Sequence, residues 1–177
     1  MAILKVAQLG HPVLRRVARD LTPDEIRSDP IRVLVENMCE TMVEYGGVGL
    51  AAPQVHYSVR IAIVEFDKDN SRYEIAEPQP KKVLFNARAT VLDEAPLGTW
   101  EGCLSVDGLR GYVERASKVR VDYLDAEAEP QVLEAEGFLA VVLQHELDHL
   151  DGVLYVDRLA DPKKFAFIDE FLRHHKP

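Results

Sequence analysis

The sequence contains only two cysteines and one tryptophan, and it has no long hydrophobic run. Two cysteines are too few for a disulfide-stabilised secreted scaffold, and nothing else indicates export. All apolar runs are shorter than the roughly 18 residues that a membrane span requires, so we expect no contact with a membrane. Residues 1–6 do not have the layout of a signal peptide. Together these absences predict a cytoplasmic protein.

Positive charge is also scarce. The chain has 21 Lys and Arg residues against 30 Asp and Glu residues, which gives a formal net charge of −9 and argues against generic nucleic-acid binding. The hydrophobic fraction of 47% and the charged fraction of 29% are ordinary for a globular protein. Because no repeat or linker interrupts the sequence, we expect one domain that spans residues 1–177.

The most informative stretch is the sequence His-Glu-Leu-Asp-His at residues 145–149. On a helix, residues four positions apart lie on one face, so His145 and His149 could bind one metal ion. Glu146 could then reach a water molecule on that ion as a general base. The pattern predicts chemistry on a polarised carbonyl group. The alternative is that both histidines are ordinary residues of a buried helix.

The flanking sequence favours a helix at this place. Phe138, Val141 and Val142 continue the stripe of the two histidines, and neither Pro nor Gly occurs from 138 to 151. Gly152 is a suitable C-terminal stop. The spacing therefore predicts a buried helix that carries both histidines.

The rest of the pattern predicts an α+β fold. A helix is expected over residues 24–45, with Thr22 as N-cap and Pro23 at its first position, and a second, amphipathic helix over 162–175. Strands are expected at 59–65, 82–93, 118–124 and 131–136, and a polar surface loop at 67–80. We expect mixed or antiparallel sheets packed around a central metal-binding helix, with a helix near each terminus.

A catalytic metal ion normally takes three protein ligands, so the two histidines need a third. One protease class supplies a histidine six residues after the second one, but here that position is Tyr155. Another class supplies a glutamate about 20 residues downstream, and Glu170 lies near that distance. Cys103 is the other candidate, because it lies in a segment without helical periodicity where a cysteine can be a ligand or a nucleophile.

The context of Cys103 resembles the peptide deformylases. Three segments match the signature motifs of that family in order and in separation: Gly-Val-Gly-Leu-Ala-Ala-Pro-Gln at 47–54, Glu-Gly-Cys-Leu-Ser at 101–105, and His-Glu-Leu-Asp-His at 145–149. Residues 10–15 also resemble the N-terminal segment of the family, and the resemblance extends from about residue 3 to 160. It implies an enzyme that removes the formyl group from the N-terminal formylmethionine of newly made polypeptides and releases formate.

The resemblance also implies how the metal ion is held. Cys103, His145 and His149 would bind one divalent ion per chain, with water as the fourth ligand. The native ion of the family is ferrous, and zinc, nickel or cobalt can replace it after purification. The sequence does not select among these ions, because a Cys/His/His set suits several of them.

The resemblance further implies catalytic roles for three groups. Glu146 would transfer the proton, while the side chain of Gln54 and the backbone N–H of Leu104 would stabilise the developing oxyanion. Glu101 is either a surface acid or a residue that orients the metal site.

The expected substrate-binding region combines glycines with an apolar pocket. Glycines near residue 48 would let a peptide pair like an added strand, or they simply end a helix and form a turn. Side chains one turn before His145 would line a pocket that fits methionine. Nine residues are assigned to this region: Gly47, Val48, Gly49, Glu101, Gly102, Arg110, Phe138, Val141 and Val142.

The match to the family has two departures. Asp107 and Glu114 occupy positions where family members commonly carry proline, whereas Arg110 and Arg115 are retained. The departures affect loop rigidity and the outer substrate contacts, and they leave the metal chemistry untouched.

The C-terminal segment is basic within an acidic chain. Its basic residues are Lys163, Lys164, Arg173, His174, His175 and Lys176. They either compensate the helix dipole as solvated charges or dock the protein on ribosomal RNA near the exit of the nascent chain.

Three functions therefore compete. The first is a cytoplasmic deformylase acting on formylated nascent peptides. The second is a small metallopeptidase that uses Glu170 as third ligand. The third is a metal-binding or peptide-binding protein without activity, which is disfavoured because Gln54, Cys103 and Glu146 are all present.

Overall fold

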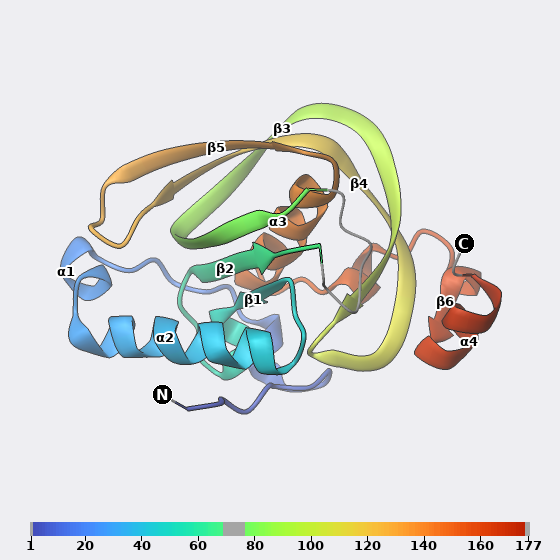
Figure 1. Ribbon diagram of the computed structural model, residues 1–177, viewed down its shortest axis with the longest axis horizontal. Helices are drawn as coiled ribbons and strands as arrows, with labels where there is room; N and C mark the ends of the chain where they lie inside the picture. Colours follow the sequence, from blue (N-terminus) through green and yellow to red (C-terminus); the bar gives the residue numbers. More distant parts are fainter. Residues whose placement is uncertain (1, 69–76, 176–177) are drawn as a thin grey trace.

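The computed structural model describes residues 2–68 and 77–175 (Figure 1). The loop expected at 67–80 falls mostly on residues 69–76, which lie outside the described residues. Within the described residues, no helix has the length and apolar character needed to cross a membrane.

The N-terminal part contains a short 3₁₀ helix, η1 (Pro12–Arg15), and two α-helices, α1 (Pro23–Ile26) and α2 (Asp29–Glu44). Thr22 caps α1 as expected, because its side chain accepts a hydrogen bond from the N–H of Glu25 while the Glu25 carboxylate accepts one from the N–H of Thr22. The expected single helix over 24–45 is wrong at its start. Pro30 lacks an N–H and its ring excludes the carbonyl of Ile26, so the chain turns and a second helix begins at Asp29.

The strands form one sheet in which the order is β1-β2-β3-β4-β5, and β6 pairs with β4. Every strand pair among the described residues is antiparallel. The strands are β1 (Gly49–Ala51), β2 (Ile61–Phe66), β3 (Gln79–Cys103), β4 (Val106–Leu124), β5 (Pro130–Glu136) and β6 (Phe165–Phe167). The four predicted strands are present, and β3 and β4 extend well beyond the predicted ranges as a long curved pair.

The sheet is buried on both faces where β2 lies, which explains the continuous apolar run of that strand. Ile61 and Ile63 pack against the Met38 side of α2, while Ala62 and Val64 pack in the cluster that contains α3 residues. Alternate side chains of a strand point to opposite faces, so one apolar strand serves two helices.

Helix α3 (Gly137–Leu150) is central, as predicted. It lies behind β1 and β2 and beneath the arch of β3, β4 and β5, and it contacts all five strands (Figure 1). Gly152 follows its end with φ +74°, and a Cβ there would lie 2.9 Å from the carbonyl of Arg15. Only glycine fits this backbone conformation and this close approach. The 3₁₀ helix η3 (Tyr155–Arg158) comes next.

The C-terminal helix is shorter than predicted. Residues 162–175 form a 3₁₀ turn η4 (Pro162–Lys164), strand β6 and then α4 (Ile168–His174). Strand β6 pairs with residues 109–111 of β4, so its backbone hydrogen bonds go to the sheet. This pairing overrides the helical periodicity of the segment. The α+β class, the antiparallel sheet and the central helix are confirmed.

Candidate metal centre and active site

Three buried side chains converge on one point. Cys103 Sγ lies 3.3 Å from Nε2 of His149, which lies 3.3 Å from Nε2 of His145. The ligand atoms of these residues all lie within 4.8 Å of one another. The two histidines come from successive turns of α3, and Cys103 is the last residue of β3, where the hairpin to β4 begins. The fold therefore brings together the three residues that the sequence singled out.

The arrangement fits a divalent ion. Two imidazole nitrogens at about 2.0–2.1 Å from a tetrahedral ion are roughly 3.3 Å apart, and the observed Nε2–Nε2 distance is 3.3 Å. One thiolate and two imidazoles form a donor set suited to zinc, iron, nickel or cobalt. The residues present can thus hold a metal ion.

The electrostatic surroundings also favour a cation at this point. Burial alone would lower the pKa of His145, but Cys103 and Glu101 raise it well above its ordinary value. Burial and the neighbouring His145 lower the pKa of His149 well below its ordinary value, so that ring is neutral and can act as a ligand. Cys103 and Glu101 therefore favour positive charge beside His145.

Glu101 lies behind the ligands rather than at a surface. Its Oε2 accepts a hydrogen bond from Nδ1 of His145 at 2.8 Å, and Arg115 binds both of its oxygens. Burial alone would raise the pKa of Glu101, but His145 and Arg115 hold it at about 2. This carboxylate fixes the His145 ring with Nε2 facing the ligand point. The geometry supports the orienting role among the alternatives considered for Glu101.

Glu146 faces the same region from α3. Its side chain is buried, and its Oε2 has no hydrogen-bond partner among the described residues. Burial raises the pKa of Glu146 to about 7, as suits a residue that accepts and returns a proton near neutral pH. Gly49 provides the space, because a Cβ there would lie 2.4 Å from Oε1 of Glu146. The structure thus gives Gly49 a role that the sequence reasoning missed.

Gln54 approaches the metal ligands from η2 (Ala52–Val55). Its Oε1 accepts a hydrogen bond from the N–H of Ala51 at 2.8 Å, which fixes the orientation of the amide. Its Nε2 then points to Sγ of Cys103 at 3.4 Å and Oγ of Ser105 at 3.3 Å. Leu104 follows Cys103 directly, so its backbone lies beside the ligand. The geometry brings the amide of Gln54 to the candidate ligands, and the oxyanion role of Gln54 and Leu104 stays a prediction.

Only some of the residues expected to bind the substrate side chain lie together in one hydrophobic cluster. Val48, Val142 and Phe138 belong to or pack against one hydrophobic cluster between α3 and the sheet. Val141 is buried in α3 but is not among the described members of that cluster.

The glycines of this region have close neighbours. A Cβ on Gly47 would lie 3.3 Å from the side chain of Leu104, and a Cβ on Gly102 would lie 1.2 Å from Nη1 of Arg110. Arg110 is itself buried. These glycines leave space for protein side chains, and an additional role toward a substrate stays a prediction.

Glu170, the alternative candidate for the third ligand, does not join the site. It lies in α4, and its carboxylate pairs with Arg173 at 3.0 Å and His174 at 3.4 Å. The side chain is 51% exposed. Cys103, the other candidate, is grouped with the two histidines as a set that could hold a metal ion.

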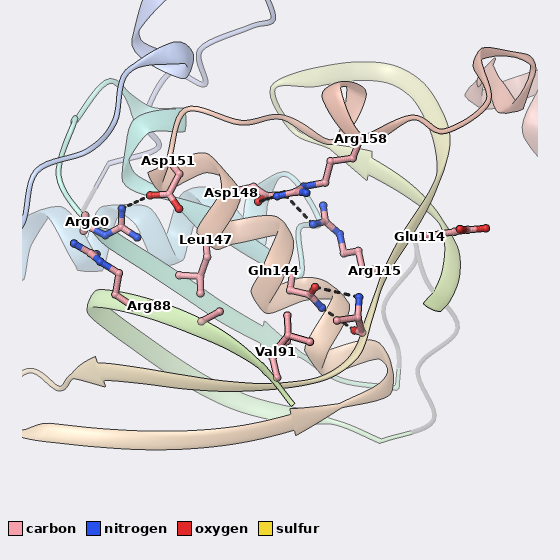
Figure 2. Close-up of a pocket in the computed structure, with 13 residues that line it drawn as sticks. Arg60, Arg88, Val91, Glu114, Arg115, Gln144, Leu147, Asp148, Asp151 and Arg158 are labelled. Atoms are coloured by element: carbon pink, nitrogen blue, oxygen red, sulfur yellow. Dashed lines mark hydrogen bonds and ion pairs between the residues drawn. The ribbon is translucent and has the colours of Figure 1, made fainter. Parts of the chain in front are cut away.

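A further face of α3 borders a cavity of about 390 Å³ (Figure 2). The residues of α3 and its C-terminus that line it are Gln144, Leu147, Asp148 and Asp151, one helical stripe. Arg115 and Arg158 converge on Asp148 at one end, and Arg60 reaches Asp151 at the other (Figure 2). Sequence patterns do not reveal these contacts, because each ion pair is set by the tertiary fold.

The fold and the site together define a candidate metal centre, with a Cys/His/His set and a buried carboxylate beside it. Residues 3–165 match the family model described as polypeptide deformylase. The chain belongs to the peptide deformylase family and is an enzyme of that kind.

Individual relatives agree with this assignment. The peptide deformylase of Leptospira biflexa serovar Patoc is 42% identical over 170 residues, which cover 96% of this chain and 95% of the relative. Peptide deformylase 2 of Pseudomonas syringae pv. tomato is 40% identical over 94% of this chain and 93% of the relative. A class I type b peptide deformylase from Acinetobacter baumannii, bound to Met-Ala-Ser, superposes with a TM-score of 0.84 at 39% identity, covering 89% of this chain and 98% of that chain.

Proposed function

We propose that this protein hydrolyses the N-formyl group of N-terminal formylmethionine on newly made polypeptides and releases formate. The observation that carries the proposal is the set of Cys103, His145 and His149, with ligand atoms within 4.8 Å, beside the buried carboxylate of Glu146. The metal ion proposed is one ferrous ion per chain, which zinc, nickel or cobalt can replace. When bound, this ion would act as a Lewis acid and lower the pKa of a water molecule, which would make hydrolysis possible near neutral pH.

Glu146 performs the proton transfers in this proposal. Its carboxylate accepts a proton from water as the water oxygen attacks the formyl carbon. The C–N bond then breaks, and Glu146 returns the proton to the departing amine nitrogen. A pKa of about 7 allows both halves of this cycle at one pH.

Gln54 and the backbone N–H of Leu104 donate hydrogen bonds to the oxyanion. The amide of Gln54 is fixed by Ala51, so its N–H group is already directed at the site. A donor held in advance costs no reorganisation during the reaction, and one such donor contributes about 3 kcal/mol.

The substrate is an extended peptide with an apolar first side chain. The relative from Acinetobacter baumannii binds Met-Ala-Ser, which supports a methionine side chain at this site. We propose that Val48, Val142 and Phe138 form the wall of the methionine pocket, with Val141 beside them, since these side chains lie on α3 and next to the edge strand β1. Gly47 and Gly49 leave the backbone of that edge accessible for pairing. Gly102, Glu101 and Arg110 act from behind Cys103, because Glu101 is bound to His145 and Arg110 lies against Gly102.

The proposal is tested by anaerobic release of formate from a formyl-Met tripeptide. Protein loaded with ferrous ion should release formate rapidly, and Glu146→Ala should bind the metal ion but lose turnover. If the wild type binds metal through Cys103 without releasing formate, the proposed substrate is wrong.

Two further aspects of the function stay predictions. One is docking of the basic C-terminal segment on the ribosome, and the other is a cytoplasmic location. Activity on formylated nascent chains is consistent with both. The metallopeptidase hypothesis loses its basis, because Glu170 is paired within α4.

A further inference from the structure

We propose that Arg158 is a positioning residue for the metal ligand His145, acting through a buried chain of charges formed by Asp148, Arg115 and Glu101. The inference rests on the proposed function, because it needs a metal ion at His145. It assigns a role to a residue of η3 that lies outside all three sequence motifs.

The inner part of the chain connects His145 to Arg115. Glu101 accepts a hydrogen bond from Nδ1 of His145 at 2.8 Å. Arg115 binds the same carboxylate through Nε at 2.5 Å and through Nη2 at 2.9 Å. Such a bidentate contact fixes the plane of the carboxylate and, through it, the orientation of the imidazole.

The outer part returns to the helix that carries His145. Arg115 uses its remaining nitrogen, Nη1, to bind Asp148 at 2.8 Å. Arg158 binds both oxygens of Asp148, with Nε and Nη2 each at 2.5 Å. Asp148 follows His145 by three residues on α3, so the contacts form a closed path from the helix through β3 and β4 and back, and Arg158 joins this path at Asp148.

Charge balance shows why Arg158 matters within this path. Glu101 and Asp148 are two buried carboxylates with side-chain exposures of 5% and 11%, while Arg115 is 2% exposed. Arg158 is 46% exposed and supplies the second positive charge. Without it, Arg115, which already binds both carboxylates, would be the only guanidinium left to balance them. A buried carboxylate that loses a partner is costly, so we expect Arg115 to shift toward Asp148 and loosen its contact with Glu101.

A neighbouring residue places η3 against His145 independently. The ring of Tyr155 is buried and stacks on that of His145, with centroids 6.1 Å apart and an interplanar angle of 21°. Tyr155 occupies the position where one protease class carries its third histidine ligand. In this chain Tyr155 supports His145 by packing, while Arg158 supports His145 through the charged side chains between them.

The test measures how fast the protein loses Co²⁺ to excess EDTA, followed by the thiolate-to-cobalt absorption band. Because outer partners of metal ligands typically change metal affinity by about 10–100-fold, Arg158→Ala should accelerate the loss about tenfold. Arg158→Lys should restore part of the retention, since an ammonium group supplies the charge without the two-pronged contact. Arg88→Ala is the matched control, because Arg88 lines the same cavity but pairs with Asp20.

A second arm separates positioning from general stability. In a Glu101→Gln background the chain is already broken, so adding Arg158→Ala should produce little further acceleration. An equal acceleration in both backgrounds, or none in the wild-type background, would overturn the inference. Failure of the wild type itself to retain Co²⁺ would instead overturn the proposed metal site, and the inference with it.

Discussion

Replacing Gly49 by alanine should displace the catalytic carboxylate without disturbing the metal ligands. Gly49 lies on β1, and its backbone φ is not in the left-handed region. Alanine therefore adopts the same backbone conformation. The perturbation is one methyl group directed at Glu146.

The size of the displacement follows from the distances. A Cβ at Gly49 would lie 2.4 Å from Oε1 of Glu146, whereas ordinary contact begins at 3.4 Å, so the oxygen must move by the difference, 1.0 Å. Misplacing a catalytic group by about 1 Å costs about 100-fold in rate, which corresponds to about 2.7 kcal/mol of activation free energy. The three atoms nearest to the new methyl group all belong to Glu146, and none belongs to a histidine. Metal retention should therefore be unchanged.

The assay combines formate release with metal analysis. We expect kcat of Gly49→Ala to fall about 100-fold at unchanged metal content. The control is the same substitution in Glu146→Ala, where the methyl group has no carboxylate to displace and should not lower the residual turnover further. A wild-type kcat in Gly49→Ala would refute the reasoning, and so would an equal loss in the Glu146→Ala background.

Three further predictions test the site, the fold and the docking surface. Cys103→Ser should weaken metal binding by at least tenfold, since it removes the soft ligand; tight binding measured by chelator competition would remove Cys103 from the ligand set. Burial alone would raise the pKa of Asp157, but Arg15 and the N–H of Leu154 lower this pKa below its ordinary value of 3.8. The ionised carboxylate therefore stabilises the fold above pH 3.8, and this stabilisation is lost as the pH falls through the lowered pKa. Asp157→Asn should therefore unfold more easily than wild type at pH 7 and equally easily in strong acid, as followed by urea denaturation. Exchanging Lys163 and Arg173 for glutamate should reduce co-sedimentation with ribosomes at low salt, and unchanged co-sedimentation would exclude docking through this segment.

The sequence predicted the fold where local signals and packing agree. The helix with His145 has an apolar pattern and a glycine stop, and α3 ends where Gly152 indicates. It failed where a distant partner decides. The segment at 165–167 has helical periodicity, but pairing with β4 makes it a strand. Pro30 was a local signal that should have divided the first helix.

The site was predictable in its chemistry and not in its support. Residue types and motif spacing identified Cys103, His145 and Glu146, because only a few residue types act as metal ligands or as acid/base groups. The partners that hold them are set by tertiary contacts. Arg158, for example, is ten residues from Asp148 in sequence, and only the path of η3 brings its guanidinium to that carboxylate.

Each of the five residues in the sequence His-Glu-Leu-Asp-His makes a specific contact, because α3 is buried on several sides. His145 and His149 face Cys103, and Glu146 faces Gly49. Leu147 packs in the main hydrophobic cluster, and Asp148 binds Arg115 and Arg158. One turn of helix therefore fixes the metal ligands and the charges that orient them relative to one another. A substitution at Asp148 should act on the candidate metal ligands through this rigid geometry, because Arg115 binds both Asp148 and the Glu101 carboxylate that holds His145.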